Sequence, residues 1–365
     1  MREITVAHLD DLAMGAAVLG TGGGGDPYIG KLMARKAMAG RPAVQLLDFA
    51  DLDDDALVVP SAMIGAPTVM VEKVPSGKEA IAAFRALESF MGRRIDATMP
   101  IEIGGMNSLM PFTVAAELGL PMVDGDGMGR AFPELQMVTQ TIAGLTASPM
   151  GLSDEKGNSL ILNTITNQWA ETFARTATVQ MGAAALMAIF PMTGAEVKRA
   201  CIPGTLTLIG EIGRAIREAH AAHRDAVAAV CAVTGGVPVW TGKVGDIERR
   251  TIGGFARGTA RVEGNGDHTG RTLEVDFQNE FLIARSGEDV LVTTPDLITM
   301  LDAETGEPIT TEQLRYGFRV VVIGIPSHRL WRTEMGLALT GPGYFAYDLE
   351  FFPLESRYPE ARHIS

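Results

Sequence analysis

The sequence predicts an α/β protein with a largely parallel sheet and flanking helices, followed by a second, mostly β domain. Between residues 43 and 124, short apolar runs alternate with segments of helical periodicity, an order typical of a parallel sheet covered by helices. Beyond residue 235, strand-like runs follow one another with Gly or Asp between them, as in antiparallel sheets. A length of 365 residues also exceeds what one core usually organises. We therefore expect two domains, at 1–235 and 236–341, with an aromatic tail at 342–365 that packs back on the protein.

The elements expected in the first domain follow from periodicity and from turn residues. Apolar residues at helical spacing predict seven helices, and β-branched or apolar runs predict five strands. The expected helices are 5–18, 28–39, 77–91, 108–118, 166–189 and a pair at 194–200 and 206–223; the expected strands are 43–49, 56–64, 97–103, 121–124 and 159–162.

The second domain is expected to hold strands at 237–244, 253–262, 272–285, 289–293 and 318–325, with one short helix at 311–315.

The composition excludes several classes of partner. The net charge is −13, from 31 basic and 44 acidic residues, which disfavours nucleic acid and anionic membranes. No run of about twenty apolar residues exists to span a bilayer, and the first residues lack the apolar region of a signal peptide. We expect a cytoplasmic protein that acts on a small molecule. An alanine-rich helix within 166–189 suggests a homo-oligomer.

A run of glycines between the first two expected helices is the most conspicuous motif. Thr21 and Asp26 flank it, and its members are Gly22, Gly23, Gly24 and Gly25. Glycine allows backbone N–H groups to approach a ligand closely, and the following helix offers its positive N-terminal end. No buried strand precedes the run and no Gly-Lys-Ser/Thr follows it, so it is neither a dinucleotide fingerprint nor a Walker A loop. We interpret these six residues as part of a binding site, against the alternative of a tightly packed turn.

Two further loops at expected strand ends combine glycines with polar groups. Because ligands of such sheets bind beyond the carboxyl ends of the strands, we assign both loops to the site. Asp124 and Asp126 either bind a divalent cation or form an acid/base pair; the alternative is a structural role in turns and caps. The remaining candidates of these loops are Glu102 as general acid, Gly105 and Asn107 as ligand contacts, Arg130 as the partner of a substrate carboxylate, and Glu134.

The two cysteines and the polar residues of the second domain give weaker candidates. Cys201 is either an inert buried thiol or a nucleophile near a helix end, and we expect Arg175 to face solvent. Asn279 interrupts an otherwise apolar strand beside Glu280, so one of the two is expected to face inward, at a domain interface. His268, on a glycine-rich hairpin tip, is a possible zinc ligand without the local pairing of a metal motif.

Taken together, these motifs resemble the family long known as DUF917 and now described as S-methyl thiohydantoin desulfurase-like. The resemblance rests on the glycine loop, on 104–107, on the run 124–134, on 277–280 and on 295–298, and it extends over nearly the whole chain. It implies an α/β amino-terminal domain, a β-rich carboxy-terminal domain and a link to hydantoin-type heterocycles.

Two functions are compatible with these observations. One is a hydrolase of a hydantoin-type five-membered ring, using water activated by carboxylates or by a divalent metal, or using Cys201 as nucleophile. The other is a non-catalytic subunit or sensor that binds a nucleotide or small anion in the glycine loop. No complete Ser-His-Asp type constellation is visible in the sequence.

Overall fold

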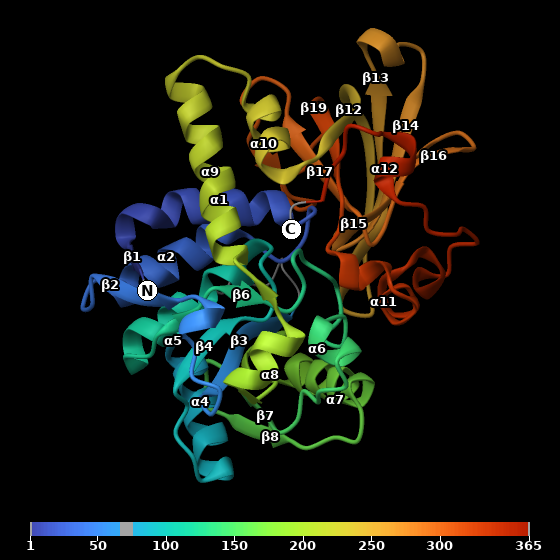
Figure 1. Cartoon of the computed structure of the whole chain (residues 1–365). Coiled ribbons are helices and arrows are strands. Elements are labelled where there is room, and N and C mark those ends of the chain that lie inside the picture. Colours follow the sequence, from blue (N-terminus) through green and yellow to red (C-terminus); the bar gives the residue numbers. More distant parts are fainter. Residues whose placement is uncertain (1, 66–75, 364–365) are drawn as a thin grey trace.

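The computed structural model describes residues 2–65 and 76–363, which form two sheets with helices packed around them (Figure 1). The first sheet has nine strands. Their order is β1 (Arg2–Thr5), β2 (Ala43–Leu47), β5 (Met122–Val123), β4 (Ala97–Pro100), β3 (Leu57–Gly65), β9 (Ala184–Ala188), β7 (Met150–Ser153) and β8 (Ser159–Leu162), with β10 (Met192–Thr193) also paired to β3.

The predicted α/β fold class is confirmed, and the sheet is parallel at its centre. Strands β2, β5, β4 and β3 run parallel to one another, whereas the pairs at both edges are antiparallel. A parallel pair needs a crossover connection, and α4 (Lys78–Met91) and α5 (Met110–Leu118) occupy the crossovers at the centre. Side chains of β3 alternate between two cores: Val58 packs on one face and Val59 on the other, so the strand is apolar apart from Ser61.

The second sheet has eight strands, and all its pairs are antiparallel. The strand order is β16 (Asp289–Thr293), β15 (Glu280–Ser286), β14 (Thr272–Gln278), β13 (Phe255–Gly264), β12 (Val237–Ile252), β19 (Arg319–Ile325), β17 (Leu297–Asp302) and β18 (Pro308–Ile309). A two-stranded sheet, β6 (Gly125–Asp126) with β11 (Ile202–Pro203), lies apart from both.

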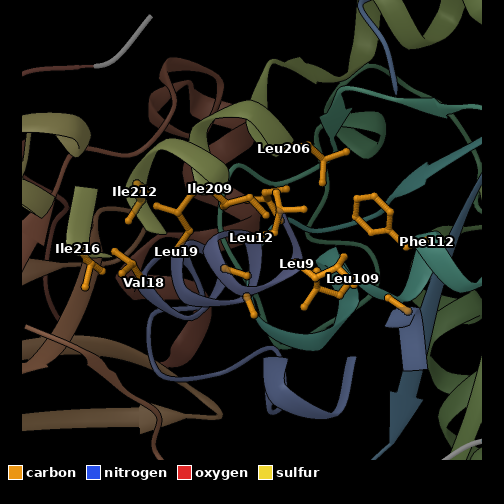
Figure 2. Packing of buried hydrophobic residues seen from close by; sticks show 14 of the residues in the cluster. Leu9, Leu12, Val18, Leu19, Leu109, Phe112, Leu206, Ile209, Ile212 and Ile216 are labelled. Atoms are coloured by element: carbon orange, nitrogen blue, oxygen red, sulfur yellow. The ribbon is translucent and has the colours of Figure 1, made fainter. Parts of the chain in front are cut away.

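A helical layer joins the two sheets (Figures 1 and 2). Helix α1 (Leu9–Leu19) packs against α9 (Thr205–Ala221), and Figure 2 shows Leu12, Ile209 and their neighbours filling the contact. The same core includes Leu301 and Ile323 of the second sheet. The other helices are α2 (Pro27–Met38), α6 (Thr139–Ile142), α7 (Asn167–Gln180), α8 (Gly194–Ala200), α10 (Ala226–Thr234), α11 (Glu334–Thr340) and α12 (Leu354–Arg357), with 3-10 turns η1 (Val6–His8), η2 (Phe49–Asp51), η3 (Gly105–Ser108), η4 (Gly266–His268), η5 (Arg329–Arg332) and η6 (Pro342–Phe345).

Three sequence predictions about single elements are wrong. The helix expected at 166–189 ends at Gln180, because Gly182 and Ala183 take positive φ angles of 92° and 66°, and the alanine-rich run after them is strand β9. The strand expected at 272–285 is the hairpin β14–β15, which reverses at Asn279 with φ 57°. Residues 311–315 form a turn instead of a helix. Several elements were not predicted, among them β1, α10, β7 and β17.

The tail beyond residue 341 lies against the protein. Leu354 and Ala361 belong to the core of the second sheet, and Phe345 packs on the core of the first. None of the helices within residues 2–65 and 76–363 combines the length and apolar character needed to cross a membrane.

Gly105 shows how closely backbone segments approach at the junction. A Cβ on Gly105 would overlap the Gly24 carbonyl, whereas a Cβ on Gly144 would meet nothing; both residues have positive φ, 65° and 76°. We expect Gly105→Ala to lower the free energy of unfolding by about 1–3 kcal/mol more than Gly144→Ala does, because only the first must displace packed backbone. Urea unfolding of the two variants checks this. Equal losses would show that the close approach costs nothing.

Candidate functional site

A cavity lies between the first sheet and the β14–β15 turn of the second. It encloses about 650 Å³, including its open mouth. One wall is polar and is built by Gly24, Gly25, Glu102, Asn107, Asn279 and Glu280; the other is apolar and includes Ala62, Met63, Ile64, Met128, Phe132, Leu135, Met187 and Ile189. Glu134, Glu171 and Arg175 also line it. Both sheets therefore contribute to one site, as is common for ligand pockets.

The glycine loop reaches this cavity only with its last two glycines. Its earlier part is packed between the sheets: the Thr21 carbonyl accepts from the Phe281 N–H at 2.7 Å, and the Gly22 carbonyl accepts from the Thr311 N–H at 2.8 Å. A Cβ on Gly23 would overlap the Glu280 carboxylate. The glycines are thus required first for close packing of backbone and side chains from two sheets.

The loop also lacks the features of a phosphate cradle. The Gly23 N–H donates to the Gly20 carbonyl at 2.8 Å and the Gly24 N–H donates to Glu280 Oε1 at 3.0 Å. The N-terminus of α2 is capped by Asp26, whose carboxylate accepts from the Tyr28 N–H at 2.9 Å. With a carboxylate already at the helix end, the electrostatic attraction for a second anion is reduced.

Glu102 and Glu280 form the chemical centre of the polar wall. Asn107 Nδ2 donates to Glu102 Oε1 at 2.5 Å, just as the Gly24 N–H holds Glu280 Oε1. The second oxygen of each carboxylate, Oε2, is buried and has no hydrogen-bond partner within the described residues. Buried polar atoms are nearly always paired, so two unsatisfied oxygens at one cavity indicate the place where a ligand or water binds.

Burial raises the pKa of both carboxyl groups. The pKa of Glu102 lies well above its usual value because of burial and then because of the charges of Glu280 and Asp126. Burial also raises the pKa of Glu280, to about 8, although the Arg130 guanidinium and the Gly24 N–H oppose the shift. Because the two groups repel when both are ionised, they titrate as a pair. Glu280, which has a cation beside it, ionises first.

Arg130 supplies that cation from a fully buried position. Its Nε donates to the Ala131 carbonyl at 2.9 Å, its Nη1 to the Pro295 carbonyl at 2.6 Å and its Nη2 to Thr21 Oγ1 at 3.0 Å. Burial lowers its pKa to about 10, which leaves it protonated at neutral pH. The predicted role of Arg130 as partner of a substrate carboxylate is therefore corrected, since its side chain ties the glycine loop to residues 295–296 and does not line the cavity.

The cavity lining carries a second set of charges. Glu171 pairs with Arg175 one turn later on α7 and accepts from the Leu135 N–H at 3.0 Å. Glu134 accepts from the Tyr344 hydroxyl at 2.7 Å. Arg175 is the one cation among the described lining residues, and it is neutralised by Glu171. An anionic ligand finds little attraction here, whereas a neutral ring finds apolar surface and hydrogen-bonding groups.

The comparison with known proteins identifies the fold family. Residues 7–164 match the family description "S-Me-THD-like, N-terminal domain", and residues 165–354 match "S-Me-THD-like, C-terminal domain". The chain belongs to the S-Me-THD-like family. This confirms the resemblance found in the sequence. No curated protein matches the S-Me-THD-like chain.

A solved structure shares the fold of this S-Me-THD-like protein. It is the X-ray crystal structure of a protein from Chromobacterium violaceum, with 23% sequence identity and a TM-score of 0.80. The similarity covers 97% of this chain and 100% of that chain.

The structure of the S-Me-THD-like chain brings part of the predicted site together. Six predicted residues line the cavity: Gly24, Gly25, Glu102, Asn107, Glu134 and Asn279. Thr21, Gly22, Gly23, Asp26 and Gly105 lie beside it with the structural contacts described above. The chemical roles of all these residues stay predictions.

Asp124 and Asp126, predicted as a cation site or an acid/base pair, accept hydrogen bonds from separate groups. The Asp124 carboxylate accepts hydrogen bonds from Thr207 at the start of α9 and from Arg2 on β1. Asp124 does not line the cavity. Asp126 is buried and does not line the cavity; its Oδ2 accepts from the N–H groups of Met128 and Gly129 at 2.8 Å each. Burial raises the pKa of Asp126 to about 7.

The predicted metal ligands are also separate. His268 stacks on Trp240 of the second sheet, with ring centroids 4.2 Å apart, whereas Asp124 and Asp126 belong to the first domain. Among the residues that the structure describes, no group of three or more His, Cys, Asp or Glu could hold a metal ion.

Glu171 is a lining residue to which the sequence assigned no role, and Glu280 was given no chemical role; Arg175 was expected to face solvent but also lines the cavity. The signal for Glu280 was present: a polar triplet, 278–280, interrupts an apolar segment. The sequence analysis placed Asn279 and Glu280 on opposite faces of one strand. This was wrong because the chain reverses at Asn279, which was not predicted. The Asn279 side chain accepts from the Ala256 N–H at 2.8 Å and so holds the turn.

The raised pKa of Glu280 gives a stability prediction. The folded state binds this proton more tightly than the unfolded chain, so the stabilisation is complete below the ordinary pKa of 4.5 and is lost as the pH rises through about 8. We expect the free energy of unfolding to fall across this window, and to fall less in Glu280→Gln. Urea unfolding at a series of pH values checks this, with Glu117→Gln on the exposed side of α5 as control. Identical pH dependence in all three proteins would contradict the prediction.

Cys201 is predicted to be an inert thiol in the folded protein. It is buried, accepts a hydrogen bond from Gln140 Nε2 at 3.3 Å, and has its pKa raised by burial and by the charge of Asp126. Because the thiolate is the reactive form, we expect iodoacetamide to leave Cys201 unmodified in the native state and to label it after unfolding, as peptide mass spectrometry would show. The half-buried Cys231 serves as internal reference. Rapid native labelling of Cys201 would restore the nucleophile hypothesis.

Proposed function

We propose that this protein hydrolyses a hydantoin-type five-membered ring, with an S-methyl thiohydantoin-like thioimidate as the model substrate. The observation that carries the proposal is the pair Glu102 and Glu280, each with one oxygen held by a fixed donor and the other buried and unpartnered in a cavity. Two carboxyl groups whose environments separate their pKa values supply a general acid and a general base at one site. Membership of the S-Me-THD-like family supports the choice of ring.

In this proposal Glu280 acts as the base. Arg130 favours its ionised form over that of Glu102, so Glu280 takes a proton from water as the water oxygen bonds to the ring carbon that carries sulfur. Glu102 donates its proton to the adjacent ring nitrogen. The carbon–sulfur bond then breaks, Glu280 returns a proton to the leaving sulfur, and the new hydroxyl returns one to Glu102. Water and thioimidate give a ring carbonyl, a ring N–H and methanethiol.

The remaining residues of the cavity orient the ring. Asn107 fixes the Glu102 carboxyl while its own Oδ1 accepts from the Met63 N–H at 2.8 Å. The apolar wall, with Met63, Met128 and Met187, suits the S-methyl group and an uncharged ring substituent, because thioether side chains adapt to irregular apolar surfaces. The same wall and carboxyl pair are compatible with hydrolysis of a ring amide.

Replacing either carboxyl group tests the proposal. We expect Glu102→Gln and Glu280→Gln each to lower the rate of methanethiol release from S-methyl thiohydantoin by about 100-fold or more, since a general acid or base contributes about that much. A thiol-trapping reagent measures the rate, and circular dichroism verifies the fold. In the unaltered enzyme kcat/KM is expected to rise with pH through about 8 as Glu280 ionises.

The control for this experiment is Glu117→Gln. Glu117 is an exposed residue near the end of α5 and does not line the cavity, so its replacement leaves the cavity intact. It is expected to keep full turnover. Unchanged turnover in Glu102→Gln and Glu280→Gln would exclude the carboxyl pair, and absence of turnover in the unaltered protein would favour the binding-subunit function.

A further inference from the structure

A second cavity lies on one face of the second sheet, where the tail segment passes over strands β12, β13 and β14. It encloses about 820 Å³, including its open side. Arg250, Arg257, Asp276 and Gln278 line the sheet side, while Phe345 and Tyr347 form the opposite wall. Its lining residues are entirely different from those of the first cavity.

The strand register places two arginines side by side in this cavity. Arg257 on β13 lies directly opposite Arg250 on β12 and directly opposite Gln278 on β14. Residues directly opposite in an antiparallel pair share a face, with Cβ atoms about 5 Å apart. Like charges at such positions are destabilising unless an anion lies near them.

The acidic neighbours of these arginines leave Arg257 without a partner. Glu248 pairs with Arg250 at 2.7 Å. Asp276 accepts from Thr259 Oγ1 at 2.6 Å and from the Tyr347 hydroxyl. The Arg257 side chain has neither a hydrogen bond nor an ion pair within the described ranges 2–65 and 76–363, so it is the one charged side chain of the lining without such a partner.

Gln278 gives an independent sign that a ligand binds here. Its side chain is only 6% exposed, and its Nε2 is buried without an acceptor among the described residues. An amide nitrogen in this state costs free energy unless an acceptor is supplied from outside the chain. Gln278, whose amide nitrogen lacks an acceptor, and Arg257, whose guanidinium lacks a partner, lie directly opposite each other on β14 and β13.

We propose that this second cavity binds a small organic carboxylate. Arg257 holds the carboxylate through two parallel hydrogen bonds, the geometry that guanidinium and carboxylate groups share, and Gln278 Nε2 donates to one of its oxygens. The apolar body of the ligand lies against Phe345 and the Leu282 side of the cavity. The site is independent of ring hydrolysis, although only one turn separates the two cavities: Gln278 lines the second, and Asn279 and Glu280 line the first.

Isothermal titration calorimetry with benzoate tests this site on the full-length protein. We expect saturable binding of one benzoate per chain, no binding of the uncharged isostere benzamide, and affinity for benzoate at least about tenfold weaker in Arg257→Gln, because a charge-assisted bidentate contact is lost. Gln278→Leu, which removes the amide donor at nearly the same volume, is expected to weaken benzoate as well.

The matched control is Arg214→Gln, which removes an exposed arginine on α9 outside both cavities and is expected to leave benzoate affinity unchanged. Absence of saturable benzoate binding would overturn the proposal. So would equal affinity in Arg257→Gln and the unaltered protein, since benzoate would then bind elsewhere, or equal affinity for benzamide, since the cavity would then recognise only the ring.

Discussion

The structure depends on one fully buried cation, the Arg130 guanidinium. Arg130 lies in the loop after β6 in the first domain. Its guanidinium donates to Thr21 of the glycine loop and to the carbonyls of Pro295 and Asp296 beside the second sheet. Its guanidinium also lies over the Phe132 ring, 4.2 Å from the centroid. Removing such a charge from water costs several kcal/mol. Of the hydrogen bonds that offset this cost, those to the Pro295 and Asp296 carbonyls require the two sheets to be docked. The same charge gives Glu280 its lower pKa within the carboxyl pair. Assembly of the junction and the chemistry proposed for it thus share one residue.

Patterns between residues close in the sequence predicted several of the helices. Apolar periodicity gave α2, α4, α8 and α9 with their ends displaced by a residue or two, because periodicity and capping are encoded along the chain. The alanine-rich run that forms β9 was placed in a helix, since small residues carry no strong preference for period 2 or 3.6. What decides its conformation is burial between two cores, which only the folded protein supplies. The antiparallel edges of the first sheet were not predicted for the same reason.

The candidate site shows the same division. Glu102 and Asn107 were found because they follow a strand of the parallel block, where polar loop residues converge. Asp124 occupies an equivalent place in the sequence, yet its carboxylate is engaged by Thr207, a partner 83 positions away that no local pattern reveals. Glu280 was missed as an acid/base residue because its proximity to Glu102 arises from docking of the second sheet. The glycine run was predicted to form part of a binding site, whereas most of its glycines serve the contact between sheets.

The location of the cavity across the junction restricts how this family can vary. The residues of the first family domain supply Glu102, and those of the second supply Glu280. The boundary between the two matched domains, after residue 164, therefore divides the carboxyl pair between them. Neither half contains both carboxyl groups of the proposed site, and a recombinant that joins halves from two relatives is expected to need a glycine loop and a β14–β15 turn that fit each other. The two halves are expected to change together during evolution even though each has its own sheet.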